Sequence, residues 1–187
     1  NQPNYLIKDN KPVVFMFGTQ NFVNILGGLE NANKAIDYWN EECKKAGFDG
    51  ILIISDGTSG NFVSTASNFA QGYVYSYGWQ YDSRSAKTQL TRNDAYFASG
   101  AKTVGSVTMG WGRNAWSSAE LGEIFATPET IKETIVGLKE RFAREQDPTN
   151  MIILTCWDEY GEGHFFSPTR VHGFEYLNAV RDAVTSL

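Results

Sequence analysis

Residue types that build metal centres and disulfide frameworks are scarce in this sequence. The chain of 187 residues has two cysteines and two histidines, and their spacing matches no metal-binding motif. No glycine-rich nucleotide-binding motif follows any apolar run. We therefore expect neither a metal site nor a bound cofactor. Cys43 falls in a helical pattern and Cys156 in a strand pattern, so each is expected to be a buried free thiol.

Long apolar runs and blocks of positive charge are also absent from the sequence. No run approaches the roughly 20 apolar residues that cross a bilayer, and the N-terminus lacks the pattern of a signal peptide. The 16 lysines and arginines are outnumbered by 21 acidic residues, for a net charge of −5, and they form no cluster. We therefore expect neither a membrane span nor a nucleic-acid partner.

What the sequence does contain is short apolar runs that alternate with helical patterns. Strands are expected at residues 13–17, 51–54, 71–79, 103–109 and 151–157. Helices are expected at residues 31–47, 90–100, 127–147 and 173–187, and a glycine-containing loop at 22–30. Asn31 is expected to cap the first helix and Gly47 to end it. Thr127 and Pro128 are a strong start signal, because threonine caps helices and proline suits their first turn.

This alternation predicts a single α/β domain over residues 1–187 with parallel strands. Glycine, aromatic and charged residues recur just after the strands, where barrel enzymes carry their catalytic groups. A TIM-type (β/α)8 barrel needs eight strand–helix units and about 250 residues, whereas about five units are visible here. The sequence therefore favours the C-terminal portion of such a barrel.

A partial barrel would leave unpaired strand edges and uncovered apolar faces. Residues 13–17 and 151–157 would be the most affected, because the strands that complete the layers of barrel side chains are missing. We therefore expect the chain to pair with a missing N-terminal barrel segment or with a second copy of itself. The isolated chain is accordingly expected to be inactive.

The most distinctive stretch runs from Met151 to Gly163, MIILTCWDEYGEG. An apolar run that is expected to be a buried strand ends abruptly in three acids within five residues, Asp158, Glu159 and Glu162. An acidic surface turn that caps the next helix is one interpretation. A carboxylate pair that cleaves glycosidic bonds beside aromatic rings is the interpretation we favour, because such cleavage uses one protonated and one ionised carboxyl group.

The segment from Trp157 to Gly163, followed by Pro168 and by Gly173, resembles a known family signature. It is similar to the W-N-E-W-x-E-G motif of the family 99 glycoside hydrolases and of the related WbsX-like proteins of bacterial polysaccharide loci. In those proteins the motif follows the last barrel strand. Trp111, preceded by glycine, resembles their motif after the seventh strand.

The resemblance implies a role for each carboxyl group of the pair. Glu162 would be the general acid that protonates the leaving oxygen and then acts as the base. Glu159 would remove a proton from the 2-hydroxyl of the substrate, so that this oxygen attacks the anomeric carbon. The sequence departs from the family pattern at Asp158, where asparagine is usual, and at Gly112, where an acid is common. Both departures bear on the substrate more than on the reaction.

Other aromatic and polar residues near the strand ends are candidates for sugar binding. These candidates are Asp56, Tyr77, Trp79, Trp111, Arg113, Tyr160 and His164. The aromatic rings could stack on sugar faces or pack at the barrel mouth, and the charged side chains could bind sugar hydroxyls or be solvated. His164 could touch substrate or be a satisfied loop histidine.

These observations predict a glycoside hydrolase that acts on a mannose-containing or related glycan or polysaccharide. The alternatives are a glycosyltransferase-type role in polysaccharide assembly and a non-catalytic glycan-binding protein. The lack of a nucleotide-sugar phosphate motif weighs against the first alternative, and the presence of both Glu159 and Glu162 weighs against the second. The resemblance would suit a periplasmic or cell-surface location in a bacterium, although no signal is visible in the chain.

Overall fold

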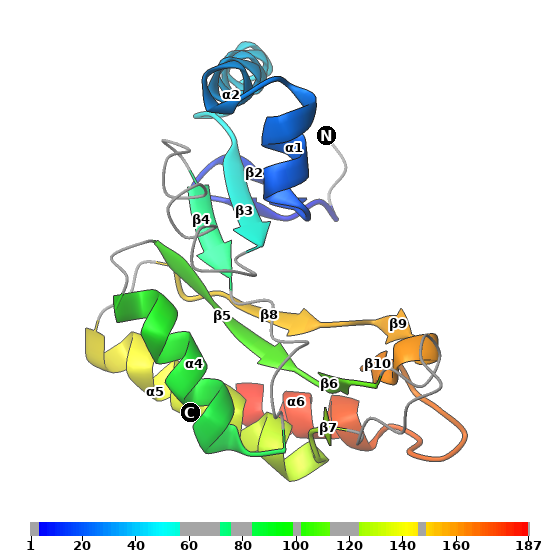
Figure 1. Ribbon diagram of the computed structural model, residues 1–187. Helices are drawn as coiled ribbons and strands as arrows, with labels where there is room; N and C mark the ends of the chain where they lie inside the picture. The colour runs from blue at the N-terminus through cyan, green and yellow to red at the C-terminus, as the bar shows by residue number, and fades with distance from the viewer. Residues whose placement is uncertain are drawn as a thin grey trace. The chain divides into compact units, whose positions relative to one another are not determined.

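The chain divides into two compact units in the computed structural model (Figure 1). One unit comprises Asn1–Tyr75 and Ser99–Thr103, and the other comprises Ser76–Ala98 and Val104–Leu187. The structure describes residues 4–56, 72–75, 84–98, 102–112, 124–145 and 149–186. Within these ranges no helix is long and apolar enough to cross a membrane.

Parallel strands form the framework of the first unit. Strand β2 (Lys11–Met16) pairs in parallel with β3 (Leu52–Asp56), and β3 pairs in parallel with β4 (Gly72–Tyr75). A short strand that the sequence did not predict, β1 (Ile7–Lys8), pairs with β2 in the antiparallel sense. Every residue of β3 is buried, in agreement with its apolar sequence.

Two helices, α1 (Thr19–Ile25) and α2 (Leu29–Lys45), connect β2 to β3. The buried residues of α2 include Ala32 and Ile36, which lie one turn apart on the same face of the helix. They pack against residues from β2, α1 and the start of β3. The buried apolar cluster consists of Met16, Val23, Ala32, Ile36, Ile51 and Ile53.

Helix α1 shows that the predicted loop at residues 22–30 was wrong. Gly27 and Gly28 have φ values of 79° and 130°, so they end the helix rather than exclude it. The first turn is anchored by Thr19, whose backbone N–H and hydroxyl both donate to Oδ1 of Asp56, at 3.1 and 2.8 Å. Because this partner is distant in sequence, the local pattern could not reveal the helix.

The predicted N-cap of α2 was also wrong. The helix begins at Leu29, directly after Gly28. The side-chain amide of Asn31 donates instead to the carbonyl of Leu26, at 2.8 Å. The predicted end is close to the observed one, since Gly47 follows shortly after the helix with a φ of 93°.

The second unit contains a parallel pair of predicted strands. Strand β5 (Thr103–Thr108) lies beside β8 (Ile152–Thr155), with Thr108 opposite Thr155. Strand β5 is buried along its whole length, whereas β8 is only half-buried before Thr155. Parallel pairing has the sense that a (β/α)8 barrel requires, and the barrel itself stays a prediction.

Three helices, α4 (Ala86–Ala98), α5 (Pro128–Glu145) and α6 (Glu175–Thr185), belong to the second unit, and α5 contacts both of the others (Figure 1). Their apolar faces form one core with β5. The buried residues of this core are Val107, Met109, Ala126, Ile131, Ile135, Leu138, Phe142, Phe166, Tyr176 and Ala183. The contribution of α5 to this core is Ile131, Ile135, Leu138 and Phe142, which are spaced to lie on one face of the helix.

The start of α5 confirms its sequence signal. Thr127 Oγ1 accepts the backbone N–H of Thr130 at 3.1 Å, and Pro128 is the first helical residue. The capping threonine thereby satisfies one of the donors that a helix leaves unpaired at its N-terminus.

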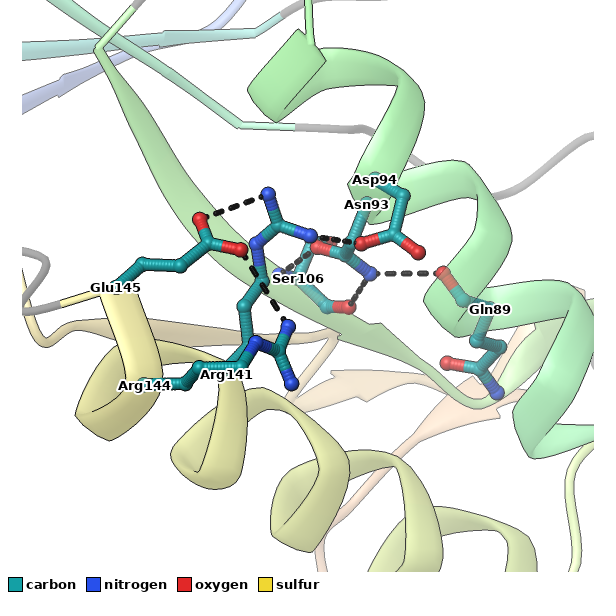
Figure 2. Close-up of polar contacts among 7 residues, drawn as sticks. All are labelled: Gln89, Asn93, Asp94, Ser106, Arg141, Arg144 and Glu145. Atoms are coloured by element: carbon teal, nitrogen blue, oxygen red, sulfur yellow. Dashed lines mark hydrogen bonds and ion pairs between the residues drawn. The ribbon is translucent and has the colours of Figure 1, made fainter.

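Amide side chains of α4 pair with the backbone of β5 in the manner of a neighbouring strand. Asn93 donates to the carbonyl of Ser106 at 2.9 Å and accepts its N–H at 2.8 Å. Gln89 makes the same two contacts with Thr108, both at 3.1 Å. Asn93 also donates to the backbone carbonyl of Gln89, one turn earlier on α4, at 2.9 Å (Figure 2). The buried N–H and carbonyl groups of Ser106 and Thr108 are therefore all satisfied without water.

A charged contact on the outer side joins α4 to α5. The Arg141 guanidinium forms ion pairs with Asp94 and Glu145 (Figure 2). It also lies over the ring of Phe97, 4.2 Å from the ring centroid. The contact between the two helices thus combines ion pairing with a cation–π interaction.

Replacement of Asn93 by leucine should lower the free energy of unfolding by about 2–5 kcal/mol, because two buried backbone groups of Ser106 would lose their partners. Urea unfolding followed by circular dichroism measures the change. Asn178, on the exposed face of α6, is the matched control, and its replacement by leucine should change stability by less than about 0.5 kcal/mol. Equal effects at the two positions would contradict the role given to Asn93.

Candidate functional site

A small hairpin follows β8 and carries the predicted acids. Strand β9 (Asp158–Glu159) pairs in the antiparallel sense with β10 (His164–Phe165), and a 3-10 turn, η2 (Tyr160–Glu162), joins them. Gly163 completes the turn with a φ of 64°. A Cβ atom at this position would lie 2.3 Å from the ring of Phe125, so both the backbone conformation and the packing require glycine.

Hydrogen bonds on both sides attach the hairpin to the rest of the unit. The backbone N–H of Gly112 donates to the carbonyl of Glu162 at 2.8 Å. At the other end, the N–H of Phe166 donates to the carbonyl of Cys156 at 2.8 Å. Gly112 directly follows β6 (Gly110–Trp111), a strand that comes just after β5. The hairpin is therefore held at the carboxyl ends of β5 and β8.

The structure brings Glu159, Glu162 and His164 together. One donor atom of each lies within 4.8 Å of the others. The Glu159 side chain is 48% exposed, so a ligand can reach it, whereas His164 is fully buried beneath it. The two carboxyl groups of the predicted pair therefore lie close together on one hairpin.

An indole group holds one of the two carboxylates. Trp111 Nε1 donates to Oε2 of Glu162 at 2.7 Å. Trp111 was singled out from the sequence as a ring that stacks on sugar or packs at a barrel mouth. Its contact with Glu162 is a third role that the sequence did not suggest.

Burial and neighbouring charges shift the pKa values of Glu159 and His164. Burial raises the pKa of Glu159, and the charges of Glu162 and Asp158 raise it further, against the opposing effect of a hydrogen bond from Cys156. Burial lowers the pKa of His164, although the Thr155 carbonyl and the Glu162 charge oppose this effect. His164 is therefore neutral near pH 7, while Glu159 holds a proton to higher pH than an ordinary glutamate.

The same three residues offer a donor set for a cation. Two carboxylates and one imidazole at this spacing could coordinate a divalent ion. Acidic groups commonly lie this close without a metal, however, and we assign none to them.

The other predicted binding residues occupy different settings. Tyr160 is 54% exposed beside the acids, its hydroxyl contacts Ser167 and its ring lies 5.4 Å from that of Phe165.

Asp56 belongs to the first unit, where it is buried and accepts hydrogen bonds from Thr19. The substrate-binding roles of these residues stay predictions. So do those of Tyr77, Trp79 and Arg113, which lie outside the described residues.

Two further residues of the site were not predicted as site residues. Thr108, at the end of β5, places its hydroxyl oxygen 3.3 Å from Nε2 of His164 and accepts the N–H of Gly110 at 3.1 Å. Trp157, between β8 and the hairpin, exposes 57% of its surface next to the acids. A threonine at a strand end is a weak signal, and only the fold shows what it contacts.

Residues 64–180, which include the hairpin and Trp111, match the family described as "Glycosyltransferase WbsX". The match covers more than half of the chain, and the chain belongs to this family. The family's description refers to enzymes that act on carbohydrate.

One curated relative has a different kind of name. A stretch of 76 residues is 30% identical to "NAC domain-containing protein 4" of Oryza sativa subsp. japonica. The stretch covers 41% of this chain and 22% of the rice protein, so the chain spans less than a quarter of that relative. No function is transferred over so short a segment. No solved structure matches the chain.

Replacement of Glu159 by glutamine should raise the melting temperature at neutral pH. The raised pKa of Glu159 means that its charge opposes folding above that pKa, and glutamine removes the charge. The gain should shrink as the pH falls through the raised pKa, because Glu159 is then protonated in the wild type. Differential scanning calorimetry across this pH range measures it.

The matched control for this measurement is Glu140→Gln, which removes an equal charge from an exposed position on α5. This variant shows how the melting temperature changes when the chain loses one negative charge at an exposed position. An equal gain at both positions, or a gain at Glu159 that grows towards acidic pH, would contradict the electrostatic argument.

Proposed function

We propose that this protein is a glycoside hydrolase that acts on a mannose-containing or related glycan or polysaccharide. The observation that carries the proposal is the pair of Glu159 and Glu162 on one hairpin. A carboxyl oxygen of one lies within 4.8 Å of a carboxyl oxygen of the other, and Trp111 holds Glu162 through a hydrogen bond. Hydrolysis of a glycosidic bond requires two carboxyl groups in different protonation states on either side of the reacting atoms. Membership of the WbsX family supports a carbohydrate substrate.

The proposed reaction proceeds in two steps and follows the resemblance to the family 99 hydrolases. In the first step Glu162 gives its proton to the leaving oxygen as the bond to the anomeric carbon breaks. Glu159 takes the proton of the 2-hydroxyl, whose oxygen forms the new bond to that carbon. The first step thus leaves a three-membered ring of the 2-oxygen and two sugar carbons. In the second step Glu162 removes a proton from water, and the water oxygen bonds to the anomeric carbon. The bond between that carbon and the 2-oxygen breaks, and the 2-oxygen recovers its proton from Glu159.

The electrostatics of Glu159 suit the role of a base. Its raised pKa means that the ionised carboxylate binds a proton more strongly than an ordinary glutamate does. A sugar hydroxyl is a weak acid, so a stronger base assists its deprotonation. The exposure of the Glu159 side chain leaves room for the sugar.

A glycosyltransferase-type role is the second candidate, and the description of the family favours it. The same two carboxyl groups could serve a transfer reaction in which a sugar hydroxyl replaces water in the second step. A non-catalytic glycan-binding protein would use the acids only to contact hydroxyl groups. Product analysis with and without an added acceptor sugar separates the three candidates.

We also propose that the parallel strands are part of a (β/α)8 barrel, completed by a preceding segment or by a second copy of the chain. Each unit has apolar groups that a complete barrel would cover: β8 is only half-buried in the second unit, and the Phe15 ring on β2 is exposed in the first. Analytical ultracentrifugation of the chain, alone and with its N-terminal extension, tests this proposal. A monomer that cleaves glycans without an extension would contradict it.

Glu162→Gln should lower kcat by about 10²–10⁴-fold, the usual contribution of general acid–base catalysis, while glycan binding persists. Sugar release from defined mannans and related polysaccharides measures turnover, and calorimetric titration measures binding. Asp158→Asn is the matched control, because it changes an adjacent carboxyl group to the residue that is usual in the resembled motif. Unchanged turnover in Glu162→Gln would remove Glu162 from the reaction.

Trp111→Phe should lower kcat by up to about 100-fold with little change in KM, because the ring is kept while the donor that positions Glu162 is lost. Steady-state kinetics on the same glycans measure both constants. Trp39→Phe is the matched control, because it makes the same substitution in the first unit, where the indole of Trp39 packs on Phe22. A raised KM with an unchanged kcat would mean that Trp111 binds sugar and does not position the acid.

A further inference from the structure

A row of aromatic side chains leads away from the acid-bearing hairpin. The rings of Tyr160, Phe165 and His172 follow one another, with centroids 5.4 Å apart for the first pair and 6.3 Å apart for the second. Neighbouring rings are tilted by only 35° and 32°, so their planes face in similar directions. These three residues are called the aromatic strip.

A buried tyrosine supports the strip on its inner side. Tyr176 on α6 is 8% exposed, and its ring meets the second and third rings of the strip edge to face, at centroid distances of 6.4 and 5.4 Å. Its hydroxyl donates to the carbonyl of Ala126 at 3.1 Å. At the other end of the strip, the hydroxyl of Tyr160 contacts that of Ser167. Packing and hydrogen bonds therefore fix the rings in place.

The last ring of the strip is held by a closed turn between β10 and α6. The backbone groups of Thr169 and Gly173 bond to each other in both directions, at 3.3 and 2.8 Å, and Gly173 has a φ of 51°. The hydroxyl oxygen of Thr169 also accepts the backbone N–H of His172 at 3.0 Å. The position of His172 is therefore set by the backbone as well as by ring contacts.

The strip is exposed although it is rigid. Tyr160 is 54% exposed, the His172 side chain is 39% exposed, and Phe165 is half-buried. Exposed rings forgo the free energy that burial would supply. Rigid rings, however, lose little conformational entropy when a ligand packs on them. A rigid and exposed set of rings is therefore better suited to binding a ligand than to stabilising the fold.

The two ends of the strip indicate the chemistry of this ligand. Tyr160 lies on η2 between Glu159 and Glu162, so the first ring adjoins the proposed catalytic pair. At the far end, Nδ1 of His172 is 3.8 Å from Oε2 of Glu175, which provides polar groups for hydroxyl contacts. A purely apolar partner would bury these polar groups without hydrogen bonds, at a cost. A sugar chain offers both C–H faces that pack on rings and hydroxyl groups around them.

We propose that the aromatic strip binds the sugar units that extend from the reacting unit of the glycan. The strip then selects chains of several sugar units over monosaccharides. This inference rests on the proposed function for the position of the reacting unit, but binding to the strip is measured without turnover. It adds Phe165 and His172 to Tyr160, which the sequence alone had suggested as a binding residue.

The first test is calorimetric titration of the full chain carrying Glu162→Gln, which slows turnover, with mannose and with a manno-oligosaccharide of four units. The tetrasaccharide should bind more tightly than mannose. Tyr160→Ala and His172→Ala should each weaken tetrasaccharide binding by roughly 3- to 10-fold, because one ring contact is lost. Tyr160→Phe keeps the ring and should bind as before. Tyr38→Ala is the matched control, because Tyr38 is 63% exposed on α2 in the first unit.

The second test is proton NMR of the imidazole rings in the same Glu162→Gln chain. The sequence has two histidines, and a His172→Asn variant assigns their signals. Addition of the tetrasaccharide should shift the signals of the exposed His172 ring, whereas mannose should leave them unchanged. Unchanged His172 signals in the presence of a bound tetrasaccharide would place the sugar chain elsewhere and overturn the proposal.

Failure of the strip and failure of the proposed function give different results. Glycan cleavage together with undiminished tetrasaccharide binding in Tyr160→Ala and His172→Ala would reject the strip and leave the hydrolase in place. Length-dependent binding that both variants weaken, in a protein that cleaves no glycan even with its N-terminal extension, would support the strip and reject the hydrolase. Failure of the chain to bind the tetrasaccharide would overturn the strip. So would a dimer that either variant dissociates in analytical ultracentrifugation, because the rings would then bind protein.

Discussion

The pairing of amide side chains with the backbone of β5 is the contact on which the second unit depends. Gln89 and Asn93 satisfy four buried backbone groups that would otherwise need a neighbouring strand. Each such group would cost free energy if it were left unpaired. One of the paired residues is Thr108, whose hydroxyl contacts His164. The hydrogen bonds that satisfy the backbone of β5 therefore also hold the residue that contacts His164. Strand stability and site geometry thus have a common origin in α4.

The close approach of the two acids on the hairpin costs electrostatic free energy. Glu159 and Glu162 repel each other when both are ionised, and burial adds to the cost for Glu159. The indole of Trp111 and the backbone of Gly112 hold Glu162 where it is. Clusters that oppose stability in this way are typical of functional sites, since a purely structural turn would gain nothing from them. Family membership and local physics therefore point to the same part of the chain.

Much of this arrangement could be predicted from sequence because it is encoded locally. The Thr127 cap and the acid pair are examples, since neighbouring residues suffice to define them. Helix α1 could not be predicted, because its anchor is the contact between Thr19 and Asp56, which are far apart in the chain. The burial of His164 was missed for the same reason, since it depends on a hairpin and on β5 together. The predicted barrel concerns contacts of a still longer range.

Glycine at position 163 has a consequence for how this protein can diverge. Its conformation and the ring of Phe125 leave no room for a side chain, so the turn between the two acid-bearing arms cannot drift gradually. The spacing of Glu159 and Glu162 on the hairpin is therefore tied to the size of the side chain at position 125.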